Sequence, residues 1–302
     1  MPEVTANGIK IAYESYGDPS HPTALLIMGL GGQLTMWSDE LVEDLVAGGY
    51  RVVLFDNRDI GLSHHHSGEK TPNIIRQMIA RRIGIKLKAP FELRDMAQDT
   101  IGLMDALKLD QVHLVGISMG GMIGQHVASM APERIATFTA IMTSTGNPKI
   151  PRPSGTVMKA MLRRGPPPTT REAIIDQSVA TFSIIGTPGE DQNTNGMRDR
   201  ITRSFDRSYN PAGVIRQMSA IIASGDFRKH TRRVKAPTLV MHGSEDPLVS
   251  PAAGKDVARN IHGSRLKIIE GMGHDVPPRF LGEITQHMLG HFDAAKVYSP
   301  AE

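Results

Sequence analysis

Short apolar runs recur along the chain, separated by segments with helical spacing. Six runs stand out, at positions 24–28, 51–55, 112–115, 135–142, 238–241 and 266–269. Aliphatic runs of this length are typical of strands buried on both faces of a parallel sheet. Between the second and third runs, apolar side chains follow a spacing of three and four, which predicts a helix: Leu93, Met96, Ala97, Thr100, Met104 and Leu107. With a last helix expected over 280–295, the pattern predicts an α/β fold with helices on both faces of a mostly parallel sheet.

The first sixteen residues follow a different pattern. Apolar and polar positions alternate from Val4 to Tyr16, on either side of Asn7-Gly8. An Asn-Gly pair supplies the positive φ angles that a tight hairpin turn needs. We therefore expect the sheet to begin with an antiparallel N-terminal hairpin.

A long interruption separates the fourth and fifth runs. It contains several prolines and a piece rich in Gly, Asn and Asp at 186–196. It also carries apolar residues at helical spacing, too many to stay solvated: Ile174, Ile175, Val179, Phe182, Val214, Met218, Ile221 and Ile222. The sequence therefore predicts a core domain of residues 1–145 and 234–302, carrying an inserted helical cap over 146–233.

Composition removes several classes of protein. The 302 residues include no cysteine, which excludes disulfides, thiolate metal sites and a cysteine nucleophile. The 34 Lys and Arg against 31 Asp and Glu give a net charge of only +3, spread along the chain, which argues against nucleic acid as a partner. No apolar run approaches the roughly 20 residues that span a bilayer. Because the first residues lack a signal-peptide pattern, we expect a cytoplasmic location.

One motif indicates a nucleophile. Gly116-Ile117-Ser118-Met119-Gly120 follows a predicted buried strand and precedes a helical stretch, which is the setting that Gly-x-Ser-x-Gly requires. A serine on this sharp turn is lifted above the sheet, and the two glycines let strand and helix pass close together. Ser118 is therefore the candidate nucleophile.

A serine hydroxyl needs a base to remove its proton, and twelve histidines are available. His274 follows the last predicted strand in a glycine-lined turn, at the carboxyl edge of the sheet where ligands bind in α/β folds. His113, His126, His287 and His291 fall inside a predicted strand or helices and are better explained as core or surface residues. His274 is therefore the candidate base.

The acid that orients the base is expected in the loop after the fifth run. Asp246 lies there, four residues beyond His242. Its neighbour Glu245 should point away, and Asp275 is too near His274 along the chain to reach the distal ring nitrogen. A buried carboxylate on the ring fixes the tautomer and stabilises the imidazolium. The order Ser118, Asp246, His274 is that of α/β-hydrolases.

An oxyanion hole needs two donors beside the nucleophile. We expect these to be the backbone N–H groups of Met119 and of Leu30, in the glycine-rich loop 28–33 after the first run. Gly29 and Gly31 would let this backbone approach the substrate, although a plain strand-to-helix turn accounts equally well for the Gly31-Gly32 pair.

With these residues identified, the chain resembles the α/β-hydrolase-fold serine esterases over nearly its whole length, and the aclacinomycin methylesterase-like branch in particular. The resemblance rests on Gly-Ile-Ser-Met-Gly-Gly at 116–121, on 242–247 and on Gly273-His274. Residues 56–63 are similar to the Asp-x-Arg-Gly-x-Gly-x-Ser segment of such hydrolases, with Asp59 in place of the middle glycine. Met28-Gly29 stands where His-Gly is usual, which leaves no histidine to act in that loop.

These residues favour hydrolysis of a carboxylic ester, of methyl or small to medium acyl type, through an acyl-enzyme. Thioester hydrolysis, acyl transfer to an alcohol and carbon–carbon hydrolysis use the same set and stay open, as does a non-catalytic small-molecule receptor. The 17 methionines predict a pocket of Met and aliphatic side chains. No cofactor is expected, and His64-His65-His66 lacks the accompanying ligands of a metal site. The partners are an ester and water, and a homodimer stays open.

Overall fold

The computed structural model describes the chain except residues 67, 69–70, 86–87, 163–167, 195 and 297–302. Within the described part, one eight-stranded sheet has the order β1-β2-β4-β3-β5-β6-β7-β8. The strands are β1 (Glu3–Ala6), β2 (Ile9–Tyr16), β3 (Thr23–Ile27), β4 (Arg51–Phe55), β5 (Val112–Ile117), β6 (Ile135–Ile141), β7 (Thr238–Gly243) and β8 (Arg265–Ile269). All six predicted apolar runs are therefore parallel strands, β3 to β8.

The N-terminal hairpin is confirmed. β1 and β2 pair antiparallel, and β2 pairs antiparallel with β4. The turn between β1 and β2 places Asn7 at φ 50° and Gly8 at φ 78°, the positive pair that an Asn-Gly turn was expected to supply.

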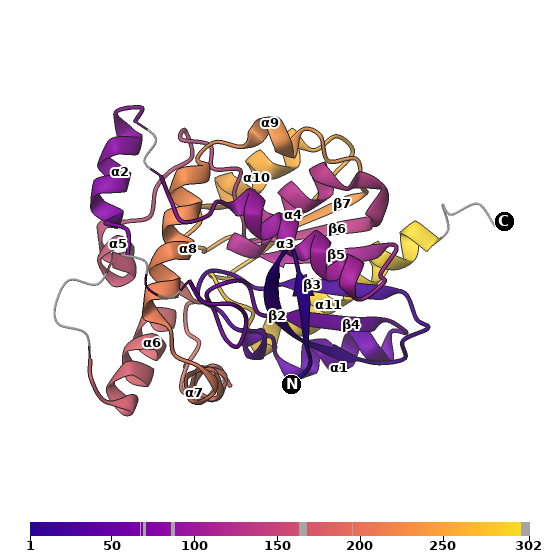
Figure 1. Cartoon of the computed structure of the whole chain (residues 1–302), viewed down its shortest axis with the longest axis horizontal. Coiled ribbons are helices and arrows are strands. Elements are labelled where there is room, and N and C mark those ends of the chain that lie inside the picture. The colour runs from indigo at the N-terminus through magenta and orange to yellow at the C-terminus, as the bar shows by residue number, and fades with distance from the viewer. Residues whose placement is uncertain (67, 69–70, 86–87, 163–167, 195, 297–302) are drawn as a thin grey trace.

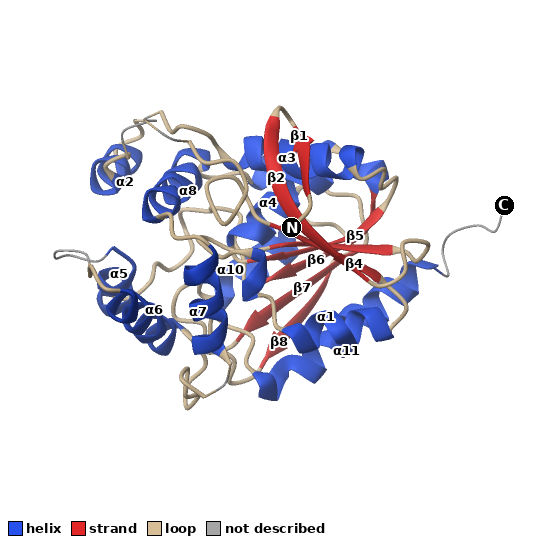
Figure 2. Ribbon diagram, turned by 60° about the horizontal axis from the view of Figure 1, so that its bottom comes forward, coloured by secondary structure: helices blue, strands red, loops and turns tan. Residues whose placement is uncertain are grey.

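Helices cover both faces of the sheet (Figure 2). One face carries α3 (Leu93–Ala106), α4 (Met119–Met130) and α10 (Pro251–Asn260), and the other carries α1 (Asp39–Ala47) and α11 (Pro278–Lys296). The apolar stripe predicted for 93–107 is buried in the first of the two cores, as is Val257 of α10. The second core holds Leu41 and Leu45 of α1 and Phe292 of α11. These two cores fix the sheet and its carboxyl edge.

Beyond this edge lie four helices of the predicted insertion: α5 (Gly155–Leu162), α6 (Arg171–Ile185), α7 (Met197–Arg207) and α8 (Pro211–Ser224). Figures 1 and 2 show them gathered on one side of the sheet, together with α2 (Ile74–Arg82), which packs against α8 although it precedes the insertion in sequence. The short α9 (Arg228–Thr231) packs instead against α4 and α10 of the core. None of the described helices is long and apolar enough to cross a membrane.

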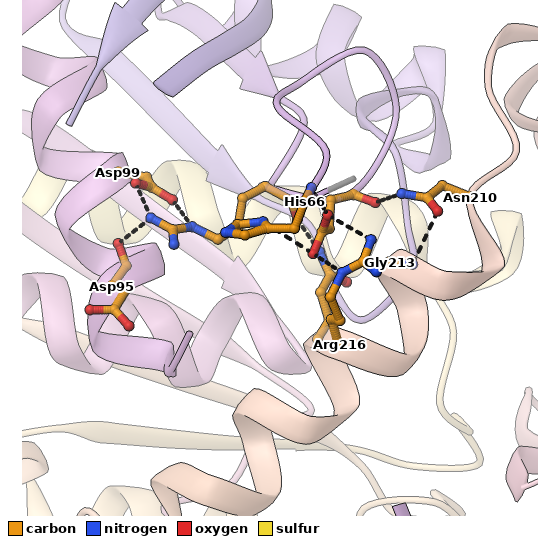
Figure 3. Close-up of polar contacts among 9 residues, drawn as sticks. His66, Asp95, Asp99, Asn210, Gly213 and Arg216 are labelled. Carbon is orange, nitrogen blue, oxygen red and sulfur yellow. Dashed lines mark hydrogen bonds and ion pairs between the residues drawn. The ribbon is translucent and has the colours of Figure 1, made fainter. Parts of the chain in front are cut away.

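Two buried ion pairs tie the loop after β4 to its surroundings (Figure 3). Arg58 donates to Asp99 of α3 through Nε and Nη2, at 2.5 and 2.6 Å. The next residue, Asp59, accepts from Nε and Nη2 of Arg216 on α8, at 2.7 and 3.0 Å. One dipeptide therefore joins α3, which packs on the sheet, to α8 of the predicted insertion.

The conformation and contacts of Asp59 explain how an aspartate can stand where glycine is usual in this segment. Its φ is 70°, the left-handed conformation that glycine adopts freely and that aspartate tolerates better than most residues. Asn210, the N-cap of α8, donates to the Asp59 carbonyl at 2.9 Å. Gly213 packs so closely that a Cβ there would lie 2.0 Å from that carbonyl oxygen. The carboxylate at 59 thus adds an ion pair where a glycine would supply only the turn.

We expect Asp59→Asn to lower the free energy of unfolding by about 3 kcal/mol or more, because it leaves the guanidinium of Arg216 buried without its counter-charge. Urea denaturation of the purified protein measures this. The matched control is Asp105→Asn, which removes a solvent-exposed partner of Arg134 and should cost less than about 1 kcal/mol. Equal losses in the two variants would contradict the importance of the buried pair.

Candidate active site

Ser118 occupies the sharp turn between β5 and α4. Its backbone has φ 54° and ψ −118°, and its N–H donates to the Ile141 carbonyl at 2.9 Å. A Cβ at Gly120 would lie 2.0 Å from the Ile27 carbonyl oxygen, and one at Gly116 would lie 2.4 Å from that of Gly120. Both glycines of the motif are therefore required by close backbone approach, as the sequence indicated.

The three predicted polar residues meet above the carboxyl edge of the sheet. His274, in the loop after β8, has Nε2 at 3.0 Å from Ser118 Oγ. Its Nδ1 lies 2.6 Å from Oδ2 of Asp246, in the loop after β7. All three come from the ends of different strands, and the Asp246 and His274 side chains are almost fully buried. The structure therefore brings Ser118, Asp246 and His274 together, with the imidazole between the hydroxyl and the carboxylate, as expected.

Asp246 is held as an ionised carboxylate. Its Oδ1 accepts from the backbone N–H groups of Leu248 and Val249 at 2.9 and 2.8 Å. Burial by itself raises the pKa of Asp246, but the imidazoles of His274 and His242 outweigh it and lower the pKa to about 2. A permanently charged acceptor therefore faces Nδ1 of His274 and leaves Nε2 free to take a proton.

The two acids that were set aside lie elsewhere. Glu245 is exposed, as expected. Asp275 is buried and points to the cap segment: its Oδ1 accepts from Thr187 N and Oγ1 at 2.8 and 2.6 Å, and its Oδ2 accepts from Gln192. Asp275 therefore fixes the chain after α6 against the loop of His274, a role that its place in the sequence did not indicate.

A cavity of about 270 Å³ opens above Ser118 and lies between the carboxyl edge of the sheet and helices α6, α7 and α8. Methionines from both parts line it: Met28, Met36, Met119, Met122, Met142, Met197 and Met218. Helices α6, α7 and α8 contribute mostly apolar side chains, among them Phe182, Ile185 and Ile221, which confirms the predicted Met and aliphatic lining. In addition to the imidazole of His274, the wall carries two charged side chains, Arg200 and Asp275.

The loop after β3 approaches Ser118 as expected. A Cβ at Gly29 would lie 3.2 Å from the Ser118 Cβ, so the backbone reaches the nucleophile directly. Leu30 and Met119 both line the cavity, and Met119 is the first residue of α4, where an N–H has no acceptor within its own helix. Gly31, which was also expected to approach the substrate, donates its N–H to Gln217 of α8 at 2.9 Å. Of the two neighbouring glycines, Gly32 is the one that lines the cavity.

The histidine triplet 64–66 is engaged within its own loop. His65 Nε2 contacts the Gly61 carbonyl, and the His66 N–H donates to Asp59. Among the residues that the structure describes, no group of three or more His, Asp or Glu side chains is arranged to hold a metal ion.

Comparison with known proteins agrees with this geometry. The family model described as alpha/beta hydrolase fold matches residues 22–171, and one described as serine aminopeptidase S33 matches 206–277. Rhodomycin D methylesterase DnrP of Streptomyces peucetius is 26% identical, over 97% of this chain and 98% of its own length. The 3-oxoadipate enol-lactonase 2 of Acinetobacter baylyi is 26% identical over 88% of this chain and 87% of its own.

Among solved structures, the enol-lactonase of Burkholderia xenovorans LB400 superposes with a TM-score of 0.74 at 23% identity, covering 97% of this chain and all of that one. At this identity the superposition speaks for the fold alone. The strand order, the turn at Ser118 and the two family matches agree on one assignment: the chain belongs to the α/β-hydrolase-fold family.

Proposed function

We propose that the protein is a serine hydrolase that cleaves carboxylic esters through an acyl-enzyme. The observation that carries the proposal is the 3.0 Å contact between Ser118 Oγ and His274 Nε2 at the foot of an apolar cavity. A hydroxyl on a strained turn, a base within hydrogen-bond reach and a buried carboxylate behind it are the requirements of acyl transfer.

In the first half of the reaction, His274 Nε2 takes the proton of Ser118 as Oγ attacks the ester carbonyl. The negative charge that develops on the carbonyl oxygen is met, in this proposal, by the N–H groups of Met119 and Leu30, two residues that line the cavity together with Ser118. His274 then gives the proton to the departing alkoxide, leaving the acyl group on Ser118. In the second half, His274 activates a water, which releases the acid and restores the serine.

The apolar wall and the named relatives favour an ester substrate. A methylesterase and an enol-lactonase, both of which open carboxylic ester bonds, match over most of this chain. Relatives named as a putative carbamate hydrolase and a hydrolase of 2-hydroxy-6-oxononadienedioate also match. The other reactions that the same three residues can catalyse therefore stay open as alternatives. We further propose that residues 146–233 act as the cap that closes over the ester, on the core of 1–145 and 234–302.

A pure receptor would have no use for the complete set of Ser118, Asp246 and His274. Retention of all three at contact distance therefore favours an enzyme.

Ser118→Ala should lower kcat/KM for p-nitrophenyl acetate and butyrate by about 10⁴-fold or more, because the nucleophile is lost while the cavity is kept. Release of p-nitrophenol, followed by absorbance, measures it. The matched control is Ser129→Ala on α4, whose hydroxyl donates to the His126 carbonyl, and this variant should hydrolyse both esters within about twofold of wild type. Equal rates for wild type and Ser118→Ala would end the proposal.

Asp246→Asn should lower kcat by about 10⁴-fold with little change in KM, because an amide cannot hold His274 in the tautomer that accepts a proton. The pKa of Asp246 is about 2, so the carboxylate is ionised throughout neutral and alkaline pH and protonation removes it only in strong acid. Titration of Asp246 should therefore cause no loss of wild-type kcat at neutral or alkaline pH. A variant Asp246→Asn that kept kcat within about tenfold of wild type at neutral pH would show that the carboxylate does not hold His274 for catalysis.

A further inference from the structure

One cation on the cavity wall has no partner. Arg200 of α7 is 7% exposed and lines the cavity, yet its Nε is buried without a hydrogen bond, and its guanidinium forms no ion pair or side-chain hydrogen bond within the described residues. The other arginines of α7 are all engaged: Arg198 with Asp176, Arg203 with Asp39 and Arg207 with Asp56. A buried charge without a counter-charge is costly, so its presence calls for a partner from outside the chain.

A second donor on the same wall also lacks an acceptor. Trp37 is 4% exposed and lines the cavity, and its Nε1 is buried without a hydrogen-bond partner. It directly follows the short helix η1 (Leu34–Met36), which packs against α7. Buried donors normally find an acceptor. Two neighbouring elements therefore each carry a buried donor that lacks an acceptor, on side chains that line the same cavity.

The carboxylates whose charges act on Arg200 either bond to other groups or lie on the surface. Glu40, Asp39 and Asp275 act on Arg200 through their charge, but none forms an ion pair with it. Asp275 is bonded to Thr187 and Gln192, Asp39 pairs with Arg203, and Glu40 lies on the surface. Apart from Asp275 and His274, the wall that Arg200 shares is mostly apolar, with Met36, Phe182 and Met197 among its lining residues.

We propose that Arg200 and Trp37 bind a carboxylate of the substrate that is not the one released by cleavage. This inference rests on the proposed function and narrows it to esters that carry a second, free acid group, such as half-esters of dicarboxylic acids. Arginine presents a planar fork of donors that matches a carboxylate, and the indole N–H adds a third donor. The apolar wall accommodates the hydrocarbon chain between the acid and the ester, whose carbonyl lies at Ser118.

The kinetic test compares two matched series in the wild-type protein. Monomethyl esters of linear dicarboxylic acids, from succinic to sebacic, are set against methyl esters of the corresponding unsubstituted acids of equal chain length. Because a hydrogen-bonded charge pair is formed with the acidic series alone, the best acidic ester should exceed its neutral match in kcat/KM by about tenfold or more. No preference at any chain length would overturn the inference.

Variants then test whether Arg200 causes the preference for acidic esters. Arg200→Gln should reduce the ratio of acidic to neutral kcat/KM by about tenfold, chiefly through KM, and Arg200→Lys should restore part of it because the charge is kept. Arg198→Gln on the same helix removes an exposed arginine of the surface, and should leave the ratio at its wild-type value. A ratio that fell equally in Arg198→Gln and Arg200→Gln would overturn the inference, since general surface charge would then explain it.

Binding supplies a readout that needs no turnover. Trp37 is the only tryptophan in the chain, so intrinsic fluorescence reports from the cavity wall itself. In the Ser118→Ala background, titration with monomethyl suberate should shift the Trp37 emission, and the same titration with Arg200→Gln added should give a Kd about tenfold higher. An unchanged Kd would refute a carboxylate site at Arg200 even if the esterase proposal stood, and a shift would support the site even if ester hydrolysis were not found.

Discussion

The turn at Ser118 is the constraint on which the rest of the site depends. A serine at φ 54° is held there because its N–H bonds to the Ile141 carbonyl and because Gly116 and Gly120 allow main-chain contacts that any side chain would forbid. This local strain raises the hydroxyl above the sheet. Only with Oγ in that position do the loops after β7 and β8 bring a carboxylate and an imidazole into line with it.

Helix α8, part of the proposed cap, is attached to the sheet domain through polar contacts that reach the loop beside Ser118. Gln217 of α8 accepts from the Gly31 N–H and donates to the Arg58 carbonyl at 2.8 Å, next to the Asp59–Arg216 pair. One amide side chain of the cap thus holds both the glycine-rich loop and the loop after β4. The backbone proposed to face the oxyanion is therefore positioned partly by α8, and in the proposed mechanism a change in α8 would act on the chemistry through main-chain position.

Much of this could be predicted from the sequence, because each of its signals was local. Apolar runs gave the parallel strands, Asn7-Gly8 gave the hairpin, and three residues at strand ends gave the meeting of Ser118, Asp246 and His274. Features set by tertiary contact were not accessible. α2 packs with the cap although it lies outside the insertion, and Asp275 and Gly31 hold cap segments. Arg200 was one of several arginines in a polar helix, and only its burial and its lack of an ion pair among the described residues distinguish it from Arg198.

The way α6 ends has a consequence for how a substrate reaches the serine. The Ile185 carbonyl accepts from the His274 N–H at 2.8 Å, and Thr187 both receives the Gly273 N–H and donates to Asp275. The end of α6 is therefore bonded to the loop that carries the imidazole. If this end moved outward, the ring would be carried away from Ser118, so in the proposed enzyme this edge of the cavity is the fixed side of any opening. The proposed ester and its products would then pass along the edges that the loops of Asp246 and His274 do not hold.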